Sequence, residues 1–256
     1  WQWPLFFSIG CASLCFIGAG LYWIMENRAM RKYSLGEAET EKVEWKDIFK
    51  FSKSYWYIVG LCFVFYGAVF PFQTFAVKFF IDAHGATREF GGFLLSLLIL
   101  FAMVATPLFG LLVDKIGKRS LIMIGGTILI LPVFLIMGFT GLSLYIPMIM
   151  MGISFSLIPA IMWPSVAYVT SENRLGTAYG LMTMLQNIGL FAFNYILGWS
   201  NDLSKASEAN PAGYNTGLLF LTGLCVLGVI FAILLRKTET GPNAHGLETI
   251  TTDTSE

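Results

Sequence analysis

Charged side chains are scarce in this chain of 256 residues. Only 12% of the residues are charged, against about 25% in an ordinary soluble domain. No Asp, Glu, Lys, Arg or His occurs at positions 120–171, 175–201 or 209–235, and 56% of all residues are hydrophobic. This composition excludes a globular domain surrounded by water. Basic and acidic residues number 16 each, so the net charge gives no reason to expect nucleic acid as a partner.

Histidine and cysteine are also rare. The sequence has two histidines, His84 and His245, and its four cysteines lie in apolar stretches at no spacing that would hold a metal ion. We therefore expect no metal and no cofactor. The apolar stretches offer no His, Asp or Glu from which to build a nucleophile and its base, so the sequence argues against an intramembrane enzyme.

The apolar stretches are long enough to cross a membrane. About 20 apolar residues in a helix cover the roughly 30 Å of hydrocarbon in a bilayer. A spanning segment has to bond its own backbone, and the alternating pattern of a β-barrel does not appear. The sequence therefore predicts an all-α membrane protein with seven spanning helices. Their expected ranges are 4–25, 54–81, 91–113, 120–139, 143–169, 176–199 and 213–235.

The basic residues fall on alternate sides of these spans. Thirteen of the 16 Lys and Arg residues would lie on one side and three on the other, which predicts that the first side is cytoplasmic. The first group is Arg28, Arg31, Lys32, Lys42, Lys46, Lys50, Lys53, Lys115, Lys118, Arg119, Arg174, Arg236 and Lys237. The second group is Lys78, Arg88 and Lys205.

Two segments outside the spans are polar. The connection 26–53 is rich in charge, and apolar residues at helical spacing between Trp45 and Phe51 predict an amphipathic helix on the membrane surface. A solvated linker with one apolar patch is the alternative. The tail 236–256 is expected to be disordered. Because the chain begins with Trp1 and not Met, we expect it to be a fragment.

One short motif is more specific than the hydropathy pattern. It reads Gly-Leu-Leu-Val-Asp-Lys-Ile-Gly-Lys-Arg over 110–119. Gly110 would allow a close helix contact, Asp114 could face a helix N-terminus, and Gly117 would permit a tight turn. Without further context, the motif could be only a loop that its cations hold on the cytoplasmic side. The residues that define it are Gly110, Asp114, Lys115, Gly117, Lys118 and Arg119.

This motif resembles the signature G-x-x-x-D-[RK]-x-G-[RK]-[RK] of the major facilitator superfamily, where it joins the second and third helices of each six-helix half. The resemblance implies the major facilitator fold and makes the seven spans helices six to twelve. Residues 1–25 would then be the last transmembrane helix of the N-terminal half, and 26–53 the cytoplasmic loop between the halves. Residues 54–235 would form the six-helix C-terminal half, 236–256 a cytoplasmic tail, and the missing N-terminal half would complete the transporter.

Further runs are similar to the lysosomal dipeptide carriers of this superfamily. They are Tyr66–Phe72, Ala160–Tyr168, and Leu175–Gly180 followed by Gln186–Leu190. The resemblance implies a multi-pass membrane transporter that moves dipeptides by alternating access, as a uniporter, in the lysosomal membrane of a eukaryote. A plasma membrane or a bacterial inner membrane is the alternative location. The resemblance also implies a glycosylated lysosomal membrane protein as accessory subunit, which a chain without Asn-x-Ser/Thr sequons would suit.

Other functions are compatible with the same helices. A facilitator could carry another small organic solute, such as an organic anion or a sugar, and a non-transporting membrane scaffold is a less favoured alternative. Proton coupling would need a titratable residue within the spans. Lys78 is the only ionised residue expected there, and it would either reach the interface or attract the carboxylate of a substrate.

Polar side chains near the middle of the second span are candidates for substrate binding, because carriers of this kind bind their substrates near the membrane midplane. Tyr66 and Gln73 share one face of that helix. A glutamine that faced lipid would cost several kcal/mol, so Gln73 should face protein or a cavity. A hydrogen bond between helices is the alternative role for Gln73.

The fifth and sixth spans supply the other candidates. Trp163 lies between Pro159 and Pro164, which we expect to break the fifth span and to place the indole in the cavity wall. A packed aromatic is the alternative. Gln186 and Asn187 are neighbours whose side chains point about 100° apart, so at least one should reach the cavity.

Overall fold

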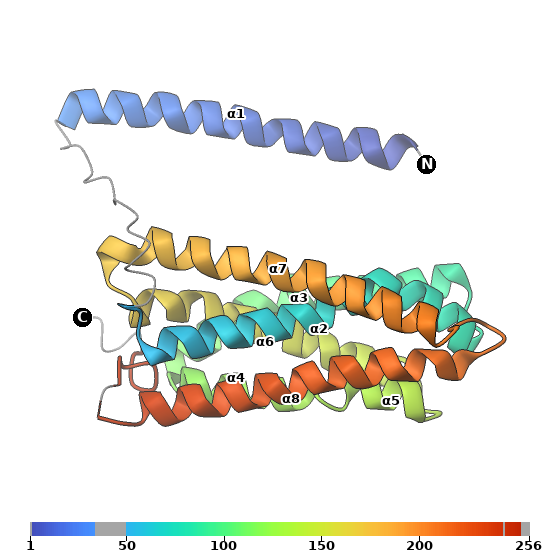
Figure 1. Cartoon of the computed structure of the whole chain (residues 1–256). Coiled ribbons are helices and arrows are strands. Elements are labelled where there is room, and N and C mark those ends of the chain that lie inside the picture. The colour runs from blue at the N-terminus through green and yellow to red at the C-terminus, as the bar shows by residue number, and fades with distance from the viewer. Residues whose placement is uncertain (1, 34–49, 243, 252–256) are drawn as a thin grey trace. The chain divides into compact units, whose positions relative to one another are not determined.

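The computed structural model describes residues 2–33, 50–242 and 244–251 (Figure 1). The chain divides into two units, Trp1–Lys42 and Val43–Glu256. The described part of the first unit is a single apolar helix, α1 (Gln2–Tyr33). The amphipathic helix expected between Trp45 and Phe51 falls largely outside the described residues.

The described part of the second unit is built from helices. Together with α1 they give seven helical segments that are long and apolar enough to cross a membrane, so the predicted number of spans and the all-α class are confirmed. The helices are α2 (Lys53–His84), α3 (Arg88–Ile116), α4 (Arg119–Ile130), α5 (Val133–Phe139), α6 (Tyr145–Val169), α7 (Leu175–Leu203) and α8 (Tyr214–Glu239), with the short 3-10 turns η2 (Glu172–Arg174) and η3 (Pro211–Gly213). The fourth span consists of α4 and α5.

The prolines of the fifth span do not break it, so that expectation is wrong. α6 runs without interruption through Pro159 and Pro164. Each proline removes one backbone hydrogen bond, but a real break would leave more groups unbonded where no water can replace them. The interruption lies instead in the fourth span, where α4 ends at Ile130 and α5 begins at Val133, directly after Pro132.

Several helices extend beyond their expected ranges. α2 continues to His84, so Asp82 lies inside the helix, just beyond the expected end of the second span. α8 continues to Glu239. The expected ends were set by the first charged residue. However, a charged residue can stay in a helix when a neighbouring side chain holds it, as Lys78 holds Asp82 and Ser54 holds Glu239.

α2 is the central helix of the second unit. It lies beside α7 and α8 (Figure 1) and also contacts α3 and α6. Of its most apolar stretch, 67% is buried, the largest share among the described spans. Two glycines allow large rings to approach its backbone. A Cβ at Gly60 would lie 2.8 Å from the Phe231 ring of α8, and a Cβ at Gly67 would overlap the Phe193 ring of α7.

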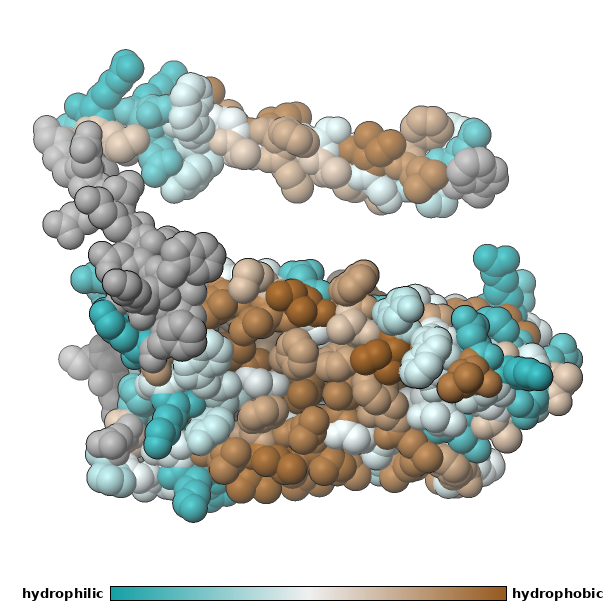
Figure 2. Space-filling view, viewed as in Figure 1, coloured by the Kyte–Doolittle hydropathy of each residue, from teal (hydrophilic) through white to brown (hydrophobic). Residues whose placement is uncertain are grey.

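The surface of the second unit separates apolar from polar side chains. Figure 2 shows an apolar band across the middle of the helices, with hydrophilic side chains gathered toward their two ends. Such a band matches the hydrocarbon of a bilayer between two layers of polar headgroups. We call the end that carries Lys53, Lys118, Arg174 and Lys237 the basic end, and the opposite end the far end.

The tail is folded where the structure describes it, which corrects the expectation of disorder. Residues 244–251 turn back onto the basic end, and Leu247 is fully buried. The backbone N–H groups of Lys118 and Arg119 donate to the carbonyl oxygens of Glu248 and Leu247 at 3.2 and 3.1 Å. A short polar segment becomes ordered in this way because partners distant in the sequence satisfy its backbone.

We predict that Gly67→Ala destabilises the protein, because the new methyl group would overlap the Phe193 ring, which itself packs on Phe63 and Phe220. The expected cost is about 1–3 kcal/mol, measured as a lower Tm of the full-length protein in detergent. Gly223→Ala is the matched control, since a Cβ there would meet no described atom within 4 Å. Equal melting temperatures for the two variants would contradict this packing.

Candidate functional site

Tyr66, Trp163 and Tyr179 form a hydrogen-bonded group, here called the aromatic cluster, that joins α2, α6 and α7. The Trp163 indole Nε1 donates to the Tyr66 hydroxyl oxygen at 3.0 Å. The Tyr179 hydroxyl donates to the backbone carbonyl of Trp163 at 3.0 Å, and the two rings stack with centroids 6.0 Å apart. Tyr179 was not singled out from the sequence. A hydroxyl-bearing ring inside an apolar span was the signal that could have found it.

Phenylalanines surround the cluster on one side. Tyr66 stacks on Phe70, one turn further along α2, with centroids 5.5 Å apart. Both rings meet Phe155 of α6 edge-on, at 6.4 and 5.9 Å. Tyr66 is buried, whereas Trp163 is half-buried. Because the Tyr66 oxygen accepts from the indole, its own proton is left for a further acceptor.

The two amides of α7 have different surroundings. Gln186 is half-buried, and its Oε1 lies 4.0 Å from the Cys62 sulfur of α2, one turn before Tyr66. Asn187 is exposed, and its Nδ2 donates to the carbonyl of Thr183 in the same helix at 2.8 Å. Gln186 therefore faces α2 next to the aromatic cluster, while Asn187 lies on an open face of α7.

Gln73 lies about two turns beyond Tyr66 on α2. Its Nε2 is buried and has no hydrogen-bond partner among the described residues. A buried donor without an acceptor costs about 1–3 kcal/mol. A carbonyl or carboxylate oxygen of a bound molecule is one group that could accept from this amide.

The structure thus brings together part of the predicted site. Tyr66 and Trp163 are hydrogen-bonded, and Gln186 lies against Cys62, one helical turn before Tyr66 on α2. Gln73 and Asn187 are not bonded to this group in the described part of the chain. Sequence spacing alone placed Tyr66 and Gln73 on one face, but it could not show which neighbouring helix that face would meet.

The signature motif occupies the connection between α3 and α4 at the basic end. Gly117 adopts φ 66°, which confirms the tight turn. Asp114 pairs at 2.7 Å with the guanidinium of Arg119, the first residue of α4. Arg119 is only 2% exposed and also lies over the Tyr168 ring at 4.5 Å, whereas Lys115 is exposed.

Two glycines within the helices lie in open positions. A Cβ added at Gly110 or at Gly180 would meet no described atom within 4 Å. Gly110 belongs to the signature motif, where a close helix contact was expected. Within the described structure, neither position is a helix-to-helix contact.

Lys78 is held by partners near the far end. Its ammonium group lies 2.5 Å from Asp82, one turn later on α2, and 3.2 Å from the Tyr214 hydroxyl of α8. The Tyr214 hydroxyl in turn donates to Asp82 at 2.5 Å. Lys78 therefore has a counter-ion within its own helix, in place of the substrate carboxylate considered above.

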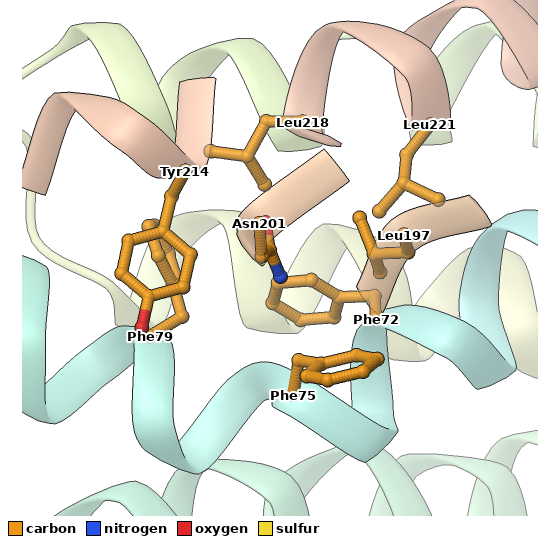
Figure 3. A pocket seen from close by; sticks show the side chains of 8 residues that line it. All are labelled: Phe72, Phe75, Phe79, Leu197, Asn201, Tyr214, Leu218 and Leu221. Atoms are coloured by element: carbon orange, nitrogen blue, oxygen red, sulfur yellow. The ribbon is translucent and has the colours of Figure 1, made fainter. Parts of the chain in front are cut away.

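A small cavity between α2, α7 and α8 does not qualify as a substrate site. Its volume is about 20 Å³, which is enough for one water molecule. The Asn201 side chain points toward the Phe72 ring there, and its Oδ1 has no partner among the described residues (Figure 3). The lining residues are Phe72, Phe75, Phe79, Leu197, Asn201, Tyr214, Leu218 and Leu221.

Comparison with known proteins agrees with this architecture. The family model described as Major Facilitator Superfamily matches residues 1–194. The chain therefore belongs to the Major Facilitator Superfamily, and it is a multi-pass membrane protein. The match includes the signature loop and all three members of the aromatic cluster.

Proteins named lysosomal dipeptide transporter MFSD1 are among its relatives. The protein from Homo sapiens is 31% identical over 225 residues, which are 85% of this chain and 46% of that protein. The Gallus gallus protein is 32% identical over 185 residues, 72% of this chain and 40% of that protein. The Danio rerio protein is 34% identical over 175 residues, which are 68% of this chain and 38% of that protein. The chain spans less than half the length of the relatives it matches.

We predict that Tyr66→Phe and Trp163→Phe are coupled, because either change breaks the same hydrogen bond and leaves its partner unsatisfied. Each single variant should lower the stability of the full-length protein by about 1–2 kcal/mol, and the double variant by less than the sum. Tyr195→Phe is the control, since Tyr195 is exposed. Additive losses in Tm would show that the two side chains act independently.

Proposed function

We propose that the full-length protein is a transporter that moves dipeptides across a lysosomal membrane by alternating access, as a uniporter. Membership of the Major Facilitator Superfamily and the names of the relatives support the class of protein and of substrate. The proposal assigns α1 to helix six and α2–α8 to helices seven to twelve, with the basic end in the cytoplasm. Residues 26–53 would join the two halves, and 236–256 would be a cytoplasmic tail.

The proposal rests on two features: the aromatic cluster, and the unbonded amide of Gln73, which lies on α2 as Tyr66 does. Tyr66, Trp163 and Tyr179 tie three helices together by hydrogen bonds. The Gln73 amide, two turns away, lacks an acceptor among the described residues. We assign Tyr66, Gln73, Trp163, Gln186 and Asn187 to this half of the substrate site.

The chemistry of these side chains suits a dipeptide. Hydroxyl, indole and amide groups are neutral donors and acceptors that match a peptide bond and the termini of a zwitterion. The flat rings of the cluster offer apolar surface to the side chains of many different dipeptides. Transport without proton coupling fits the neutral character of the groups around Tyr66. The charged residue Lys78 is paired with Asp82.

Alternating access would turn this six-helix half against the other half around the site. α2 would present the cluster to the substrate, and the signature loop would move with the basic end. A facilitator for an organic anion or a sugar would use the same motion, but neutral groups give an anion little electrostatic attraction. A scaffold would not need an unbonded amide inside the bundle.

The substrate class is tested by thermal stabilisation of the full-length protein. We expect several dipeptides to raise its Tm, because a ligand that binds only the folded state stabilises that state. Free amino acids, sugars and organic acids at the same concentrations serve as controls. A rise in Tm with a sugar or an organic acid, and none with dipeptides, would contradict the proposed substrate class. The fold assignment would stand.

Trp163→Ala should lower dipeptide uptake at normal expression. The change removes a hydrogen bond and a large wall of the site, so the uptake rate should fall about tenfold or more. Trp199→Ala is the matched control, because Trp199 is an exposed indole on α7. Equal uptake by the two variants would exclude Trp163 from the site.

A further inference from the structure

The chain after α8 wraps around a buried carboxylate. Glu239 is 3% exposed, and its Oε1 accepts from the Ser54 hydroxyl of α2 at 2.5 Å and lies 2.9 Å from His245 Nδ1. Its Oε2 accepts from the backbone N–H groups of His245 and Leu247 at 2.9 and 3.5 Å. One side chain therefore joins the start of α2, the end of α8 and the tail.

The tail supplies an N-terminal cap that α4 lacks in its own sequence. Lys118 precedes α4 in the left-handed conformation, with φ 49°, and its side chain does not cap the helix. The N–H groups of Lys118 and Arg119 donate instead to carbonyl oxygens of the tail. The Glu248 carboxylate accepts from the N–H of Ser120 at 3.0 Å and also from its hydroxyl.

Three consecutive donors at this helix start are thus satisfied by a segment 128 residues away. A carboxylate is favoured there because a helix N-terminus carries a partial positive charge. An ordinary cap is the side chain of the preceding residue, and Lys118 has no acceptor to offer. The hydrogen bonds that cap the N-terminus of α4 therefore exist only while the tail is docked.

The tail also lies against Gly117 and the Arg119 side chain of the signature motif. A Cβ at Gly117 would lie 3.1 Å from the Glu248 carbonyl oxygen, so a side chain at this position would crowd the docked tail. The Arg119 guanidinium donates to the carbonyl of Ile250 at 3.3 Å while it pairs with Asp114. The glycine and the arginine of the motif are thus adapted to the tail as well as to the turn.

We propose that residues 245–251 are a strap that positions the signature loop. Glu239 anchors the strap to α2 and α8, and Glu248 fixes the loop by capping α4. The docked strap makes the basic ends of α2, α4 and α8 one mechanical unit, and its release lets the loop relax from its left-handed turn. Glu239 and Glu248 are positioning residues: they hold the strap and the loop and lie outside the proposed substrate site.

Hydrogen exchange of the full-length protein in lipid nanodiscs tests the docking. The amides of Lys118, Arg119 and Ser120 should be protected in the unaltered protein. In Glu248→Ala the Ser120 amide should exchange about tenfold faster, because its bond to a charged acceptor is lost. Thr249→Ala is the matched control, since Thr249 belongs to the strap but is exposed. A stop codon after Gly241 should produce the largest increase.

Exchange of these amides in the unaltered protein at the rate of an unstructured chain would overturn the proposal, even if every variant misfolded. Equal protection in Glu248→Ala and Thr249→Ala would also overturn it. The effect on transport rests on the proposed function: Glu248→Ala should lower the maximal uptake rate at an unchanged half-saturation concentration. An unchanged maximal rate with faster exchange would reject a role in transport. Failure of the unaltered protein to move dipeptides would reject the proposed function and leave the docking result intact.

Discussion

A helix in hydrocarbon has no water to complete its backbone hydrogen bonds, and the rest of the structure depends on this constraint. It explains why α6 passes through Pro159 and Pro164 without a break, since a break would cost more bonds than the prolines remove. It also explains why polar groups inside the unit bond one another, as the Trp163 indole does with the Tyr66 hydroxyl. The Gln73 amide, which has no acceptor among the described residues, is for this reason assigned to the proposed substrate site.

The same constraint shapes α2, which polar contacts hold to its neighbours at three levels. Ser54 bonds to Glu239 of α8 at the basic end, and the pair of Lys78 and Asp82 meets Tyr214 of α8 near the far end. Between these levels α2 is bonded to α6 at the aromatic cluster. Charged contacts thus fix the two ends of α2 against α8, and neutral groups occupy the middle. This arrangement suits a half that moves as one body while its central side chains meet a substrate.

The spans were predictable because they depend on local composition: a charge-free stretch of about 20 apolar residues is typical of a membrane-spanning helix. The turn at Gly117 was predictable for a similar local reason. The hydrogen bond between Tyr66 and Trp163 was not, because the two residues are 97 positions apart and their meeting depends on how each helix is rotated. The order of the tail was also missed. Its sequence is polar, and its structure comes from Glu239 and the start of α4, which no local pattern indicates.

We propose that the full-length protein carries dipeptides by alternating access without an ion gradient. Counterflow in proteoliposomes with equal pH on both sides tests this claim most directly. The full-length protein, loaded with an unlabelled dipeptide, should transiently accumulate a labelled dipeptide above its external concentration, because each inward turnover is exchanged for an outward one. A labelled dipeptide that only leaks toward equilibrium, or that accumulates only when a pH gradient is imposed, would contradict the account.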